Sequence, residues 1–253
     1  MFDTLRRESR CGLIAYVTCG DRDTLQIVEE LERAGADAIE LGVPFSDPIA
    51  DGPVIQAASQ RALASGTSIG TVLELASRIR ERSEIPLVAF SYLNPVLRYG
   101  VERFAADASQ AGIDSLLLTD MPPENADDLR SSLKASGIGT VFLAAPTSSA
   151  RRLKLIDRAS DGFVYCVSTT GVTGTRSDLD PSLLDRLGEV RAALRNPIAV
   201  GFGISRHEHY VALRDRCDAV VVGSAIVRAV AEGDAAGAPR RAGNVVRTIL
   251  GGL

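Results

Sequence analysis

Three carboxylates lie near one another in the sequence, where a buried strand is predicted to end. Glu40 stands inside the apolar run 38–42, and Asp47 and Asp51 follow in the next loop. Loss of hydration in an apolar strand raises the pKa of a carboxyl group toward the range useful for proton transfer. The alternative is that Glu40 pairs with an arginine beneath a helix and that the aspartates only accept hydrogen bonds from loop amides. The favoured interpretation is two acids facing one substrate.

Two long loops are expected to frame that chemistry. Loop 43–53 is restricted by three prolines and one glycine, which limit its backbone freedom. Loop 168–180 is rich in Gly, Ser, Thr and Asp. Both follow predicted strands, and in α/β barrels the loops at the carboxyl ends of the strands carry the active site.

Glycines after the last three predicted strands indicate an anion site. They occur in the segments 171–174, 201–203 and 223–224. Glycine lets backbone amides approach an anion, and barrels often bind phosphate with the loops after strands seven and eight and a helix N-terminus. Each glycine alone is equally consistent with a tight turn. Together with the Ser224 hydroxyl, they predict a phosphate site.

Eight short apolar runs alternate with segments of helical periodicity, as expected of parallel strands covered on both faces. The runs are 13–18, 38–42, 87–90, 115–119, 139–143, 162–167, 197–201 and 219–222. No Gly/Ser/Pro-rich linker divides the chain. The pattern predicts an α/β fold, a (β/α)8 TIM barrel forming a single domain over 1–253, with a doubly wound open sheet as the alternative.

Local sequence signals predict several helix boundaries. Residues 24–34 have helical periodicity and end at Gly35, while Thr71 with Glu74 and Ser205 with Glu208 have the spacing of capping boxes. The N-terminal segment is too short to predict a full helix closing the barrel. The histidines at 207 and 209 are expected to be exposed rather than metal ligands.

Composition excludes several classes of protein. The chain of 253 residues is 45% hydrophobic and 24% charged with a formal charge of −4, which argues against disorder and a nucleic-acid surface. Its four cysteines form no C-x-x-C pair, which favours reduced thiols and the cytoplasm over a disulfide or zinc framework. No apolar run is long enough for a membrane span. Dinucleotide, Walker and metalloprotease motifs are missing.

The segment from Glu40 to Pro53 resembles the signature of tryptophan synthase α-subunits. It reads ELGVPFSDP followed by ADGP, and the similarity continues through the segments 119–123, 145–147, 171–174, 201–205 and 223–227. The resemblance implies a TIM barrel lyase that cleaves indole-3-glycerol phosphate into indole and glyceraldehyde 3-phosphate in tryptophan biosynthesis. It also implies no cofactor or metal in this chain, and a pyridoxal-phosphate β-subunit as partner in an αββα heterotetramer.

The resemblance also implies residue roles. Glu40 corresponds to the proton-shuttling glutamate and Asp51 to the aspartate that stabilises positive charge on the indole nitrogen. The remaining correspondences are Gly174, Gly203, Gly223 and Ser224 at the phosphate, Tyr16, Phe202 and Tyr165 at the indole pocket, and Asp47 in communication with the partner.

Two departures from the family pattern bear on loop closure. Arg22 replaces the proline usual after Gly20-Asp21, and Thr169 and Thr170 stand where many members carry arginine before the G-V-T-G stretch. Two alternatives to a lyase working with a partner stay open, and the altered loop 168–180 motivates the first. One is a mainly regulatory subunit that activates a β-subunit, and the other is a stand-alone lyase that releases free indole.

Overall fold

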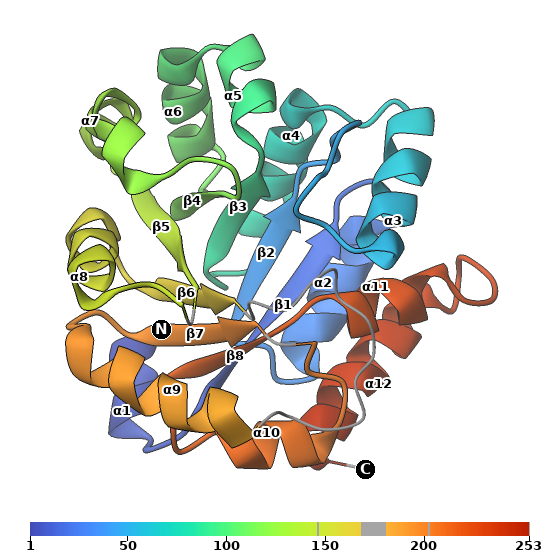
Figure 1. Cartoon of the computed structure of the whole chain (residues 1–253). Helices are drawn as coiled ribbons and strands as arrows, with labels where there is room; N and C mark the ends of the chain where they lie inside the picture. Colours follow the sequence, from blue (N-terminus) through green and yellow to red (C-terminus); the bar gives the residue numbers. More distant parts are fainter. Residues whose placement is uncertain (146, 168–180, 202, 253) are drawn as a thin grey trace.

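The computed structural model forms a closed barrel of eight parallel strands in sequence order, surrounded by helices (Figure 1). It describes residues 1–145, 147–167, 181–201 and 203–252, except the side chains of 181–183 and 185. The strands are β1 (Gly12–Thr18), β2 (Ala38–Gly42), β3 (Leu87–Ser91), β4 (Ser115–Leu118), β5 (Gly139–Ala144), β6 (Val164–Val167), β7 (Ile198–Gly201) and β8 (Ala219–Val222). Pairing of β1 with β8 closes the sheet, so the barrel prediction is confirmed and the open-sheet alternative is wrong.

Most strands are followed by one or two helices, which cover the outside of the barrel (Figure 1). The described helices are α1 (Phe2–Arg7), α2 (Thr24–Arg33), α3 (Pro53–Ala64), α4 (Ile69–Arg80), α5 (Leu93–Tyr99), α6 (Val101–Gln110), the 3-10 helix η1 (Pro123–Asn125), α7 (Asp127–Ala135), α8 (Ala150–Ala159), α9 (Pro181–Ala193), α10 (His207–Leu213), α11 (Ser224–Ala231) and α12 (Ala238–Leu250). None of the helices described is both long and apolar enough to cross a membrane.

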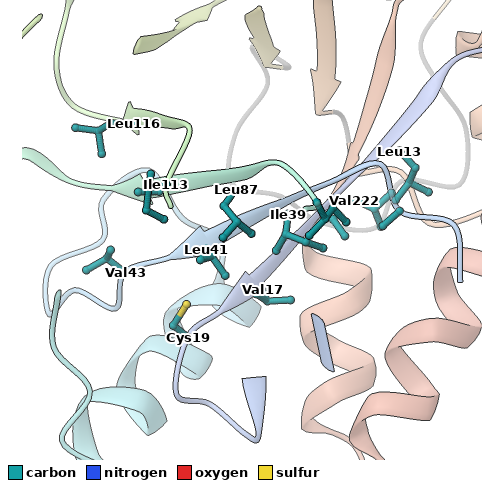
Figure 2. Packing of buried hydrophobic residues seen from close by; sticks show 14 of the residues in the cluster. Leu13, Val17, Cys19, Ile39, Leu41, Val43, Leu87, Ile113, Leu116 and Val222 are labelled. Carbon is teal, nitrogen blue, oxygen red and sulfur yellow. The ribbon is translucent and has the colours of Figure 1, made fainter. Parts of the chain in front are cut away.

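Alternate residues of each strand belong to two separate cores. The larger core lies between strands and helices, and there Ile39 and Leu87, which are paired in register, lie side by side (Figure 2). The smaller core fills the barrel interior with side chains such as Ile14, Val88 and Leu117. Burial on both faces explains why the strands read as continuous apolar runs.

A short helix closes the N-terminal end of the barrel, which the sequence did not predict. Although α1 has only six residues, the Phe2 ring lies 5.6 Å from the Phe163 ring of the interior core. Leu5 is buried, and its side chain occupies the space that a Cβ on Gly12 would need. Apolar contacts compensate for the few helical turns available, so a helix of six residues is enough to close this end.

An aspartate before each even-numbered strand anchors the preceding strand. Its carboxylate accepts a hydrogen bond from a backbone N–H at or next to the start of the odd-numbered neighbour. The pairs are Asp37 with Leu13 (2.9 Å), Asp114 with Leu87 (2.8 Å), Asp161 with Thr140 (3.3 Å) and Asp218 with Ile198 (2.7 Å). Arginines 10, 80 and 191 form ion pairs with three of these carboxylates. These four residues are called the anchoring aspartates below, and they all lie at the N-terminal ends of the strands.

The predicted capping boxes of two helices are both wrong. Helix α4 begins one turn earlier than expected, with Ser68 and Thr71 forming its capping box. Helix α10 has Arg206 at its N-cap and no side-chain cap. His209 is 4% exposed rather than solvent-facing, because α10 turns it inward.

Candidate active site

Glu40 lies on the inner face of β2, at the middle of the strand. Its neighbours Ile39 and Leu41 point into the outer core, so alternation directs Glu40 inward, beside Tyr16 of β1 in register. Its side chain is fully buried, and neither carboxylate oxygen has a hydrogen-bond partner among the described residues. Burial raises its pKa to about 8. The alternative of a helix-facing Glu40 paired with arginine is therefore wrong.

Asp51 occupies the loop between β2 and α3, in a more polar setting. The Tyr92 hydroxyl donates to its Oδ2 at 3.2 Å and accepts from the Ala50 N–H at 2.9 Å. The Gln56 side-chain amide donates to the Asp51 carbonyl at 2.8 Å. Burial raises the pKa of Asp51 to about 6, and the Tyr92 hydrogen bond partly opposes the increase. At neutral pH, Glu40 is then mainly protonated and Asp51 mainly ionised.

Two tyrosines place their hydroxyls over glycines of the next strand. A Cβ on Gly42 would lie 2.2 Å from the Tyr16 hydroxyl, and a Cβ on Gly201 would lie 2.4 Å from the Tyr165 hydroxyl. The Phe90 ring lies between them, edge-on to both, at 5.2 and 6.5 Å. These rings form an apolar wall at the carboxyl end of the barrel, as expected for an aromatic substrate.

The carboxyl groups of Glu40 and Asp51 lie close enough to Tyr16 and Tyr165 to raise the pKa of both tyrosines. Burial raises the pKa of Tyr165 well above its usual value, and the charges on Glu40 and Asp51 raise it further. The pKa of Tyr16 is raised by burial and then by Asp51 and Glu40. Both tyrosines therefore remain neutral, and the four polar groups share one site.

The predicted phosphate residues that are described lie at the ends of β7 and β8, which are neighbouring strands. Gly203 has φ +67°, a conformation that favours glycine, and no atom beyond its chain neighbours lies within 4 Å of an added Cβ. Gly223 caps α11 and Ser224 is its first residue, so α11 directs its N-terminus toward this loop cluster. Gly174 and Phe202 lie outside the described residues, as do Thr169 and Thr170.

Asp47 lies on the outer side of the same loop, away from the barrel interior. It is exposed and its carboxylate accepts a hydrogen bond from the Ser46 hydroxyl. It lines an open groove of about 1010 Å³ between loop 43–47, the connection from α3 to α4, and α5. Nearby Ile49 is 85% exposed, which is unusual for a large apolar side chain. We call this groove with Ile49 the loop face.

Several residues of the site were missed from sequence. Tyr92 follows β3 directly, and the expectation that strand ends carry the site would have identified it. In the sequence, Gly42 and Gly201 are indistinguishable from other glycines at strand ends, because a glycine that makes room for another side chain has no pattern of its own. Phe90 is likewise indistinguishable from the other apolar residues of its strand.

Comparison with known proteins identifies the family. The model of the tryptophan synthase alpha chain family matches residues 2–248. The chain belongs to the tryptophan synthase alpha chain family. A tryptophan synthase alpha chain from Solibacter usitatus is 57% identical over 233 residues, covering 91% of this chain and 87% of the relative.

Solved structures agree with the family assignment. Tryptophan synthase subunit alpha from Legionella pneumophila superposes with a TM-score of 0.92 at 33% identity, covering 99% of this chain and 95% of that one. A chain from the Pyrococcus furiosus a2b2 complex gives 0.90 at 41% identity, covering 95% and 98%. The predictions of a lyase of tryptophan biosynthesis, without a cofactor in this chain, are confirmed by membership in the family.

Proposed function

We propose that this chain cleaves indole-3-glycerol phosphate with Glu40 as proton shuttle and Asp51 as cation stabiliser. The observation that supports these roles is the contrast between two carboxyl groups in one site, one held neutral by burial and one ionised. When the surroundings of two carboxyl groups give them different pKa values, the group with the higher pKa acts as the acid and the other as the anion.

The reaction then follows from these protonation states. Protonated Glu40 donates its proton to indole C3, which places positive charge on the ring nitrogen. Asp51 stabilises that charge electrostatically. The Glu40 carboxylate next removes the proton of the glycerol hydroxyl, the bond between indole and the glycerol chain breaks, and its electrons return to the ring. The net result is indole and glyceraldehyde 3-phosphate, with Glu40 protonated again.

In this proposal the other residues of the site bind and orient the substrate. Tyr16, Tyr165 and Phe202 contact the indole ring, and Gly174, Gly203, Gly223 and Ser224 bind the phosphate. Loops 43–53 and 168–180 frame the substrate on a single domain spanning 1–253. The chain acts in the cytoplasm, in agreement with its four free cysteines.

A second subunit is part of the proposal. The structural relative from Pyrococcus furiosus comes from an a2b2 complex. We propose that the loop face receives a β-subunit carrying pyridoxal phosphate, with Asp47 as a contact. An exposed isoleucine beside a groove supports this position, because large apolar groups of soluble proteins are usually buried unless they meet a partner.

The decisive experiment measures indole release from indole-3-glycerol phosphate by purified chain. We expect Glu40→Gln to lower kcat by about 100- to 10,000-fold while it still binds a glycerol phosphate analogue. Exposed Glu84 provides the matched control, and Glu84→Gln should leave kcat unchanged. Near-normal turnover by Glu40→Gln would exclude the proton-shuttle role.

A further inference from the structure

Two buried cysteines meet across the seam that closes the barrel. Cys11 directly precedes β1 and Cys217 lies just before β8, and their sulfur atoms are 3.9 Å apart. The residues are 4% and 9% exposed. They are therefore in contact, although the two positions are 206 residues apart in the sequence.

Backbone hydrogen bonds hold the two cysteines in this arrangement. The Gly12 N–H donates to the Asp218 carbonyl at 2.9 Å, which fixes the residues next to each cysteine. The Tyr210 hydroxyl donates to the Cys11 carbonyl at 2.8 Å. A disulfide bond is about 2.05 Å long, so the sulfur atoms need to approach by roughly 1.9 Å. Side-chain rotation can provide much of that movement while the backbone pairing persists.

We infer that Cys11 and Cys217 are an oxidation site, forming a reversible disulfide across the β1–β8 seam when the protein meets a small-molecule disulfide. One thiol loses its proton to water, and its thiolate attacks the reagent and releases one reagent thiolate. The other cysteine, also deprotonated, then attacks this mixed disulfide and releases the second reagent thiolate. The two cysteines are oxidised and the reagent disulfide is reduced to two thiols.

The resting pair is reduced. The Cys217 thiol donates to the Leu213 carbonyl at 3.3 Å, and contact with Cys11 together with burial raises the Cys217 pKa. Reaction therefore requires local opening of the seam. The helix before Cys11, α1, has only six residues, and such short peripheral elements open more readily than the central strands.

The other two cysteines provide an internal comparison. Cys19 and Cys166 are also buried, and burial raises the pKa of both thiols, to about 12 for Cys166. Neither has a recorded sulfur–sulfur contact in the part of the chain that the structure describes. Burial alone thus does not distinguish the reactive pair, whereas contact between sulfur atoms does.

The test uses the full chain and oxidised glutathione below the unfolding temperature. Cys11 and Cys19 lie on one tryptic peptide, so mapping uses the Cys19→Ser/Cys166→Ser double variant. We expect an intramolecular cross-link between the peptides containing Cys11 and Cys217, reversed by dithiothreitol. Because the bond closes a very long loop, oxidation should raise Tm by several degrees. Oxidation of Cys11→Ser should give no such increase.

Three outcomes would overturn the proposal. They are glutathione adducts without a cross-link, disulfide-linked dimers of the chain, and a cross-link that leaves Tm unchanged or lowers it. If the serine variants fail to fold, the unsubstituted chain is digested with a protease that cleaves between Cys11 and Cys19, and its linked peptides are identified directly. All of these readouts are independent of turnover, so they test the seam separately from the proposed catalytic roles.

Discussion

At the scale of single residues, the site depends on how differently two carboxyl groups are solvated. Glu40 is enclosed by strand backbone and aromatic rings, whereas Asp51 retains a hydroxyl partner in Tyr92. Both pKa values lie above those of free side chains, because burial disfavours the charged form. The larger increase belongs to the carboxyl group without hydrogen bonds.

This difference predicts a bell-shaped dependence of kcat/KM on pH. Asp51 must be ionised, so activity falls as pH decreases through about 6, and Glu40 must be protonated, so activity falls as pH increases through about 8. Steady-state rates between pH 5 and 9 measure both limbs. In Asp51→Asn the acid limb should disappear along with most of the activity. An unchanged acid limb in that variant would assign it to another group.

The Tyr92 hydroxyl gives a second prediction about the same carboxylate. Tyr92→Phe removes the hydrogen bond to Asp51 and the acceptor of the Ala50 N–H, so the pKa of Asp51 should rise further. We expect the acid limb to move to higher pH and kcat/KM at pH 7 to fall about tenfold. Tyr99→Phe, which removes a hydrogen bond to Asp107 on the surface, is the control. Equal pH profiles for both variants would contradict a role for Tyr92 in positioning Asp51.

At the scale of elements, the anchoring aspartates separate stability from activity. Asp37 accepts from the Leu13 N–H and pairs with Arg10, at the end of the barrel opposite Glu40. Asp37→Ala leaves that N–H without its partner and should lower the free energy of unfolding by about 2 kcal/mol. Urea denaturation measures the loss, with exposed Asp215→Ala as the control. The kcat of folded Asp37→Ala should match that of the unsubstituted chain, and a large change would mean that the two ends are coupled.

The strands could be predicted from the sequence, whereas the helix ends could not, and the difference has a physical reason. A strand buried on both faces is composed mainly of apolar residues, so β2 and β8 were predicted with the same bounds that the structure shows, although β2 also carries Glu40. The cap of α4 depends on which of two nearby hydroxyl residues reaches the first free amide, and Ser68 does so. The choice between two such capping residues depends on the backbone conformation of a single turn, which the spacing of residues in the sequence does not reveal.

The candidate site was predictable in part. Glu40 and Asp51 were found because a carboxylate in an apolar strand and a proline-bounded loop are visible in the sequence. The inward direction of Glu40 and its lack of partners follow only from closure of the barrel. The use of Tyr92 as a partner of Asp51 depends on β3 lying beside β2, which again requires the tertiary fold.

At the scale of the whole molecule, the loop face lies on the same segment as Asp51, the proposed cation stabiliser. Loop 43–53 carries Asp47 and Ile49 outward and Asp51 inward, so a partner that orders the outer residues also positions the inner one. We therefore expect an added β-subunit to increase the rate of indole formation by at least about tenfold, within the range of typical coupling energies. Titration of the partner at fixed substrate measures the increase.

A matched pair of variants tests where that stimulation originates. Ile49→Asp should weaken it by disrupting apolar contact with the partner, whereas Val211→Asp, a similar change at an exposed site on α10, should not. A high basal rate without stimulation would favour the stand-alone lyase. Low turnover of the α chain together with strong activation of the β-subunit would favour the regulatory alternative.

The anchoring aspartates also have a consequence for modularity. Each one joins an odd-numbered strand to the even-numbered strand that follows it, across sequence separations of 24, 27, 21 and 20 residues. Each two-strand unit thus contains its own short-range anchoring hydrogen bond. A longer-range link joins the third unit to the fourth, because the Asp157 carboxylate of α8 accepts from the Arg195 and Asn196 N–H groups at 3.0 Å. A circular permutant opened between units, for example between α4 and β3, would keep both partners of each anchoring hydrogen bond in one continuous segment. A permutant opened between β3 and β4 would instead place Leu87 and Asp114 at opposite ends of the chain.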